Sequence, residues 1–319
     1  MDLVNARLLA EQPPKPLSSP RTAAVVGAEL RSLHTAGELD LPLPGGDGTA
    51  ARWAALAAFG RRDLTLARLA EGHADAVAIL AEAGRSPVPG ALYGVWAAKS
   101  GGTGAVLEDG VLTGTVRFCS GLSLLDRALV AAGDRLVEAD LADPGVRRHP
   151  DAWQAVGMDA SDSGDVVFDG VRADVVGPPG WYVARPGFAL GGAGVAAVWL
   201  GGAAGVFDGV LAYLRERGGA DEHQLAHVGA MHTALSATEA VLARAAEGPV
   251  APLLAGTCRA AAERTAVEVL ERALKVTGPT PACRDRRFAQ RVADLPVYVR
   301  QHHAERDLAA LGRDVLGTP

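Results

Sequence analysis

The chain contains 319 residues, 49% of them hydrophobic and 21% charged, with a formal net charge of −6. This length predicts two or three domains, and the apolar content excludes a disordered chain. The mild acidity offers no basic surface for nucleic acid or an anionic membrane, so neither is expected as a partner. Cys119, Cys258 and Cys283 form no C-x-x-C pair, which argues against a disulfide framework or a zinc knuckle. The start shows no basic segment followed by an apolar one, so we expect no signal peptide and predict a cytoplasmic protein.

Residues 1–85 are predicted to form a short N-terminal helical domain. After a lead-in that contains several prolines, residues 21–33 and 51–83 are rich in Ala, Leu, Arg and Glu. In the second stretch apolar side chains, among them Leu66 and Leu69, recur at the spacing of an amphipathic helix.

Residues 86–182 have a different sequence pattern and are predicted to form a β domain. Short runs of Val, Leu and Phe, such as GAVLEDGVLTGTVRF and DVVFDGVRADVV, are broken by Gly, Asp and Pro. Frequent turns between short β-prone runs favour an antiparallel sheet over βαβ units. The Asp109-Gly110 dipeptide is typical of a hairpin turn.

Residues 183–319 return to long helical stretches and are predicted to form a C-terminal helix bundle. The segment from Pro186 to Phe207 carries no charge and is long enough to cross a bilayer. It is rich in glycine and alanine and has no aromatic belt, so we expect a buried bundle helix and no membrane span. The fold class is therefore α+β, with helical, β and helical parts in that order.

Several short motifs are weak indications of chemistry. Residues 192–197 match G-x-G-x-x-A, but no preceding strand supports a dinucleotide site, so close helix packing is the expected role. His303 and Asp307 share a helical face, yet the sequence names no third ligand of matching geometry, and we predict no metal site. The stretch ASDSGD at 160–165 reads as a polar loop between strands, because no G-x-S-x-G motif accompanies it.

The most informative pair of motifs is FCSG at 118–121 together with DAWQAVGMDASDSGDVVFDGV at 151–171. A hydroxyl next to glycine in a β-rich domain can reach the edge of a flat heterocycle, because glycine permits close approach. Through these two segments, and in its order of helical and β parts, the chain resembles the acyl-CoA dehydrogenase superfamily. The resemblance covers roughly residues 50–316, with a shortened N-terminal domain.

The resemblance implies an FAD enzyme and assigns roles to particular residues. Ser120 matches the hydroxyl that bonds near flavin N5, and Phe118 matches the aromatic residue that lies along the ring. Arg217 matches an arginine that reaches a phosphate of FAD in a neighbouring subunit, and Gln224 matches a glutamine close to the same half of the nucleotide. The superfamily therefore implies a homodimer or homotetramer.

The catalytic carboxylate is the main departure from the superfamily. Dehydrogenation of an acyl thioester requires a carboxylate to remove the α-proton while hydride passes to the flavin. The register of the usual glutamate falls on Ala293, and Asp294 follows immediately. Asp294 is therefore the candidate catalytic base.

Three functions remain open from the sequence. The first is an acyl-CoA dehydrogenase-like oxidoreductase acting on an acyl-CoA or another acyl thioester, with an electron-transfer partner or oxygen as acceptor. The second is a reduced-flavin-dependent monooxygenase of the same fold, which needs no carboxylate at that position. The third is a non-catalytic scaffold without flavin.

Overall fold

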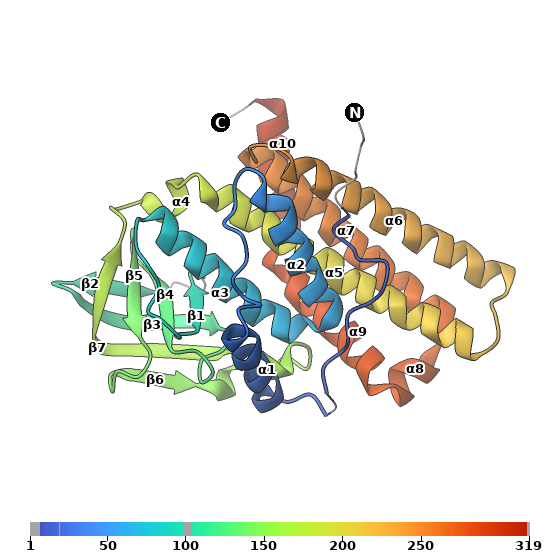
Figure 1. Ribbon diagram of the computed structural model, residues 1–319, viewed down its shortest axis with the longest axis horizontal. Helices are drawn as coiled ribbons and strands as arrows, with labels where there is room; N and C mark the ends of the chain where they lie inside the picture. The colour runs from blue at the N-terminus through green and yellow to red at the C-terminus, as the bar shows by residue number, and fades with distance from the viewer. Residues whose placement is uncertain (1–6, 19, 99–103, 318–319) are drawn as a thin grey trace.

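The computed structural model describes residues 7–18, 20–98 and 104–317. Along its longest axis a β-sheet lies at one end, three N-terminal helices lie beside it, and the long C-terminal helices fill the other end (Figure 1). The predicted order of helical, β and helical parts is confirmed.

The N-terminal helices are α1 (Ala23–Thr35), α2 (Gly48–Arg62) and α3 (Leu64–Glu82). Both helical stretches expected in this region are present, but the second is divided at Asp63. This residue has an extended backbone, and its carboxylate accepts hydrogen bonds from the amides of Thr65 and Leu66. An aspartate cap of this kind satisfies amides that the first turn of a helix leaves free, so α3 begins here.

The β domain contains seven strands in one sheet. They are β1 (Tyr93–Trp96), β2 (Ala105–Glu108), β3 (Val111–Cys119), β4 (Arg127–Ala132), β5 (Arg135–Asp140), β6 (Val146–His149) and β7 (Gly164–Val176). Most neighbours are antiparallel, as expected, and the predicted turn at Asp109-Gly110 joins β2 to β3 with both residues at positive φ. The exceptions are the β1–β4 and β2–β4 pairs, which are parallel. A parallel pair needs a crossover connection, and other strands lie between the members of each pair in the chain. Pairing of β4 with β5 closes part of the sheet into a ring.

A buried histidine attaches β1 to α3. The backbone amide of Tyr93 donates to Nδ1 of His73 at 3.2 Å. Burial, assisted by the neighbouring His34, lowers the pKa of His73 to about 4, so the ring is neutral and able to accept this bond. The contact fixes β1 against α3.

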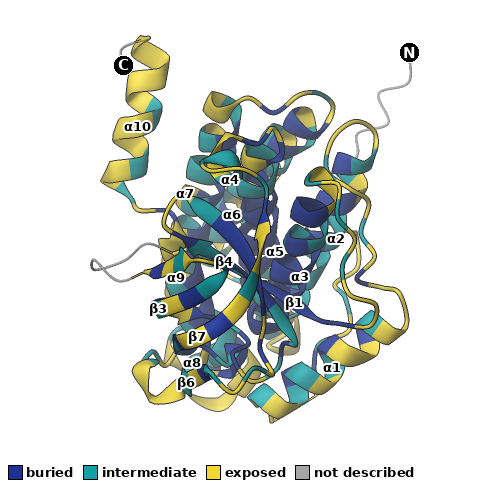
Figure 2. Ribbon diagram, turned by 90° about the vertical axis from the view of Figure 1, so that its left-hand side faces the viewer, coloured by how far each residue is buried: buried dark blue, intermediate teal, exposed yellow. Residues whose placement is uncertain are grey.

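The C-terminal part is built from helices. They are α4 (Trp181–Ala184), α5 (Gly187–Glu216), α6 (Glu222–Ala246), α7 (Pro252–Thr277), α8 (Pro279–Arg284), α9 (Arg286–Tyr298) and α10 (Glu305–Leu316). Helix α5 runs through the middle of this bundle, whereas α10 extends away from the body and is mostly exposed (Figure 2). Among the described residues α5 alone is apolar and long enough to span a membrane, and 72% of its most apolar window is buried inside the protein.

Glycines let α2 and α5 cross closely. A Cβ atom added at Gly201 would lie 2.0 Å from the carbonyl oxygen of Ala57, and one at Gly60 would lie 2.2 Å from that of Val198. Real Cβ atoms do not approach backbone oxygens so closely, so the two helices touch only because neither position carries a side chain.

We expect Gly201→Ala to lower the free energy of unfolding by about 2 kcal/mol, because the methyl group forces the helices apart. Gly229→Ala is the matched control: Gly229 is exposed in α6, with open space around the added Cβ. Better helix propensity should make this control more stable by up to about 1 kcal/mol. Urea denaturation measures both, and equal destabilisation of the two variants would contradict the close crossing.

Candidate functional site

A recess opens where β1, the end of β3 and α3 meet. Its volume, including space open to solvent, is about 180 Å³. It is lined by Arg68, Leu69, Gly72, Tyr93, Gly94, Val95, Trp96, Ser120 and Leu125. Ser120, a residue predicted to bind a cofactor, therefore lies in a recess with apolar and aromatic walls and one arginine.

The backbone is irregular at the end of β3, where Phe118 is exposed and the next residue, Cys119, is buried. The pairing of β3 with β7 shifts register between Val116 and Cys119. Phe118 has φ of 59° and is 53% exposed, while Cys119 is fully buried. A positive φ is rare for a bulky residue, and such strained positions cluster at functional sites.

Three serine hydroxyls form a chain that begins at Ser120. Ser120 Oγ lies 3.1 Å from Ser163 Oγ, and Ser163 Oγ lies 2.7 Å from Ser161 Oγ. Ser161 Oγ in turn donates to the carbonyl oxygen of Met158 at 2.6 Å. The indole of Trp96 donates to the carbonyl oxygen of Ser120 at 3.1 Å, which holds the backbone of Ser120 in place.

Arg68 has two buried partners behind the recess. Its Nη1 donates to Glu71 Oε2 at 2.5 Å, and the phenol of Tyr298 donates to the same oxygen at 3.3 Å. The pKa of Glu71 is raised overall, because the effect of burial exceeds the opposing effect of the Arg68 charge. Burial also raises the pKa of Tyr298 well above its ordinary value. The arrangement orients Arg68 and leaves a cationic donor at the recess.

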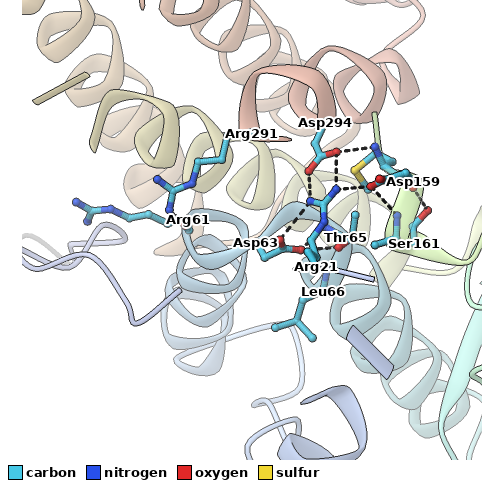
Figure 3. A network of polar contacts seen from close by, with 11 residues as sticks. Arg21, Arg61, Asp63, Thr65, Leu66, Asp159, Ser161, Arg291 and Asp294 are labelled. Atoms are coloured by element: carbon cyan, nitrogen blue, oxygen red, sulfur yellow. Dashed lines mark hydrogen bonds and ion pairs between the residues drawn. The ribbon is translucent and has the colours of Figure 1, made fainter. Parts of the chain in front are cut away.

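Asp294, the candidate base, lies in a different environment. Arg21 points its guanidinium at Asp294 from the N-terminal segment, with Asp63 and Asp159 on its other sides (Figure 3). Asp294 Oδ1 also accepts from the amide of Met158 at 2.6 Å, and Gly157 packs directly against the carbonyl of Ala293. Both carboxylate oxygens of Asp294 are thus engaged, and the residue is only 1% exposed.

Burial dominates the electrostatics of Asp294. It raises the pKa of the carboxyl, while the hydrogen bond and charge of Arg21 lower it. A raised pKa suits a base, but a base also needs access to its substrate. Asp294 lines a second recess, together with Leu17, Ser18, Arg21, Arg62, Asp63, Leu64, Arg287, Gln290 and Arg291, and Ser120 is absent from this set. The structure therefore does not bring Asp294 and Ser120 into one recess.

The two residues predicted to contact the nucleotide lie at the α5–α6 connection. Arg217 caps the end of α5 and donates to the hydroxyl of Tyr213 at 2.7 Å. Gln224 completes a capping box with Asp221 and donates to the carbonyl of Val276 at 2.9 Å. This connection lies at the opposite end of the molecule from the sheet (Figure 1). Their cofactor role stays a prediction.

Reasoning from the sequence missed Arg68, Trp96 and Ser163. Arg68 belongs to a helix whose polar residues look like a solvated face, and Trp96 ends a short strand. Ser163 belongs to ASDSGD, which was interpreted only as a polar loop. No group of three or more potential metal-ligating side chains occurs within the described ranges.

Asp294→Asn should lower the free energy of unfolding by about 3 kcal/mol, because it leaves the buried Arg21 with less compensating charge. Asp169→Asn is the control, since Asp169 pairs with Arg147 on the surface, and we expect a change within about 0.5 kcal/mol. Equilibrium denaturation of both variants tests this expectation. Equal stability of Asp294→Asn and wild type would show that the buried pair does not stabilise the fold.

Comparison with known proteins agrees with this architecture. The family described as "Acyl-CoA dehydrogenase, C-terminal domain" matches residues 179–299. No curated protein matches the chain.

Several solved structures share the fold along nearly the whole chain. FMN-bound TdsC from Paenibacillus sp. A11-2, a dibenzothiophene monooxygenase, is 21% identical with a TM-score of 0.70, over 92% of this chain and 97% of that one. Methanesulfinate monooxygenase MsuC from Pseudomonas fluorescens is 21% identical with a TM-score of 0.69, over 94% and 97%. Nitrososynthase from Micromonospora carbonacea var. africana is 16% identical with a TM-score of 0.76, over 93% of both chains. The chain thus has the acyl-CoA dehydrogenase-like fold, and the match to the C-terminal domain family covers its residues 179–299.

Proposed function

We propose that this protein is a flavin-dependent monooxygenase that uses reduced flavin and molecular oxygen to oxidise a small molecule. The observation that carries the proposal is the separation of Ser120 from Asp294 into two recesses. A dehydrogenase needs its base and its hydride acceptor on the same substrate, one on each side of the bond that is oxidised. A monooxygenase has no such requirement.

The residues around Ser120 suit one edge of a flavin ring. Ser120 supplies a hydroxyl, Arg68 supplies a cationic donor, and Gly72 has no side chain that would narrow the recess. The recess is smaller than a typical ligand pocket, so it accommodates an edge of the ring and leaves the rest outside. The exposed Phe118 supplies an aromatic surface next to this position.

FMN is the flavin that a single chain is best suited to hold. FMN and FAD share the same ring, so the Ser120 recess does not distinguish them. The residues expected to bind the second half of FAD, Arg217 and Gln224, lie at the far end of the same subunit. They reach the ring site only from another copy of the chain. FAD binding therefore requires a homodimer or homotetramer, whereas FMN binding does not.

Two of the structural relatives, TdsC and MsuC, are named as monooxygenases, and TdsC binds FMN. These names support the proposal at the level of shared fold. In the proposed reaction reduced flavin and the substrate each provide two electrons. One oxygen atom of O₂ enters the substrate and the other leaves as water. A separate reductase is the electron-transfer partner that supplies the reduced flavin.

The test measures flavin binding and flavin reactions of the purified protein. We expect reduced FMN to bind more tightly than oxidised FMN, and the bound reduced FMN to react with oxygen. An acyl-CoA panel should not bleach flavin bound to the protein under anaerobic conditions. These measurements use absorbance and fluorescence titration followed by anaerobic mixing.

Other outcomes assign one of the remaining functions. FAD that copurifies with the protein and is bleached by an acyl-CoA would contradict the proposal and favour a dehydrogenase acting on acyl thioesters. The absence of affinity for either flavin in either redox state would favour the non-catalytic scaffold.

A further inference from the structure

The recess lined by Asp294, the arginine recess, carries more positive than negative charge. Its volume is about 390 Å³, including space open to solvent. Its charged walls are four arginines and two aspartates, namely Arg21, Arg62, Arg287, Arg291, Asp63 and Asp294. Four arginines against two aspartates give a formal excess of two positive charges.

Local ion pairs use both aspartates and leave two of the arginines without a carboxylate. Asp63 and Asp294 are both ion-paired with Arg21. Arg62 pairs with Glu29, which is not a lining residue. The other two arginines, at positions 287 and 291 of α9, form no ion pair with any residue that the structure describes. The excess positive charge of the recess therefore lies on α9.

The charge of Arg291 is poorly compensated. Its guanidinium extends toward the backbone of Arg61 (Figure 3), where it donates to the carbonyl oxygens of Gly205 at 2.7 Å and Arg61 at 3.1 Å. Burial lowers the pKa of Arg291; the charge of Asp208 opposes this effect, and the charge of Arg287 adds to it. Asp208 has both oxygens bonded to Arg61 at 2.7 Å, so it is not free to pair with Arg291.

Arg287, Gln290 and Arg291 lie on one face of α9 and all line the recess. Cβ atoms four residues apart on a helix are about 5–6 Å from each other, so both guanidinium groups can reach one small anion. The side-chain Nε2 of Gln290 is buried and has no hydrogen-bond partner in the described part of the chain. A buried donor without an acceptor is costly, and a bound oxyanion would supply the acceptor.

We propose that the arginine recess binds a phosphate group, supplied as inorganic phosphate or as the phosphomonoester of a small molecule. Arg287 and Arg291 supply two positive charges, and Gln290 supplies a neutral donor. A phosphomonoester carries about −1.5 to −2 charges at neutral pH and has three strong acceptor oxygens, which matches this set. A carboxylate carries one charge on two oxygens. Ser120 is not a lining residue, so the site is separate from the recess proposed for the flavin ring.

The experiment follows urea denaturation of the purified protein in inorganic phosphate, glycerol 3-phosphate, acetate or chloride at equal ionic strength. A ligand that binds only the folded state stabilises it, and the increase with concentration gives the dissociation constant. We expect both phosphate compounds to stabilise the protein more than acetate or chloride, and the tighter one identifies the source of the group. No flavin is added, so the result is independent of the proposed function.

Phosphate also stabilises folded proteins without binding to a site, so variants of α9 decide the result. Arg287→Gln should weaken phosphate binding about tenfold, because it removes a charged donor. In chloride this variant should be at least as stable as wild type, because a like charge beside Arg291 is lost. Gln290→Met should weaken binding about fivefold without loss of stability in chloride. Arg286→Gln is the matched control: Arg286 is exposed on the same helix and outside the recess, so phosphate binding should not change.

Equal stabilisation of wild type, Arg287→Gln and Gln290→Met by phosphate would overturn the proposal, because the effect would then be non-specific. Equal weakening in Arg286→Gln and Arg287→Gln would also overturn it, because any surface charge would then have the same effect. Acetate that stabilises the protein as strongly as phosphate would contradict the class of ligand. If one of the two recess variants does not fold in chloride, the other decides the result.

Discussion

The structure depends on one buried ion pair, between Arg21 and Asp294. Arg21 comes from the N-terminal segment and also contacts Asp63, the residue that caps α3, and Asp159, which begins the turn before β7. Asp294 comes from α9 and accepts from the amide of Met158 in the same turn. Four parts of the chain, which contribute Arg21, Asp63, the Met158–Asp159 turn and Asp294, thus converge on this ion pair. A buried charge without its partner is costly, so these parts are held together as a unit.

Through Met158 the ion pair is also linked to the serine residues beside the Ser120 recess. Its amide bonds Asp294, while its carbonyl ends the serine chain that leads to Ser120. Asp294, the predicted catalytic base, thus also supports the loop that carries Ser161 and Ser163, and its catalytic role stays a prediction. The recess beside Ser120 contains the Ser120 hydroxyl, which accepts from Ser163, and Arg68, which donates to Glu71. Oxygen chemistry on a reduced flavin is compatible with this set of groups.

The sequence predicts the local features of this molecule well. The order of the helical, β and helical parts can be predicted from helical periodicity and from short β-prone runs broken by turn residues. The Asp109-Gly110 hairpin can be predicted as well, because all of these features depend on residues that are neighbours in the sequence. Ser120 is identifiable from the FCSG motif. The partner of Asp294 is not, because Arg21 lies 273 residues away in a lead-in without periodicity. The role of Ser163 is hidden for a related reason: its contact with Ser120 joins a loop to a strand end 43 residues apart.

The most direct test of this account is a crystal structure of the protein with FMN bound. The account predicts flavin N5 within about 3 Å of Ser120 Oγ, at hydrogen-bonding distance, with Asp294 still paired to Arg21. A flavin ring in the recess lined by Asp294, or an Asp294 carboxylate released from Arg21 and facing the ring, would contradict it.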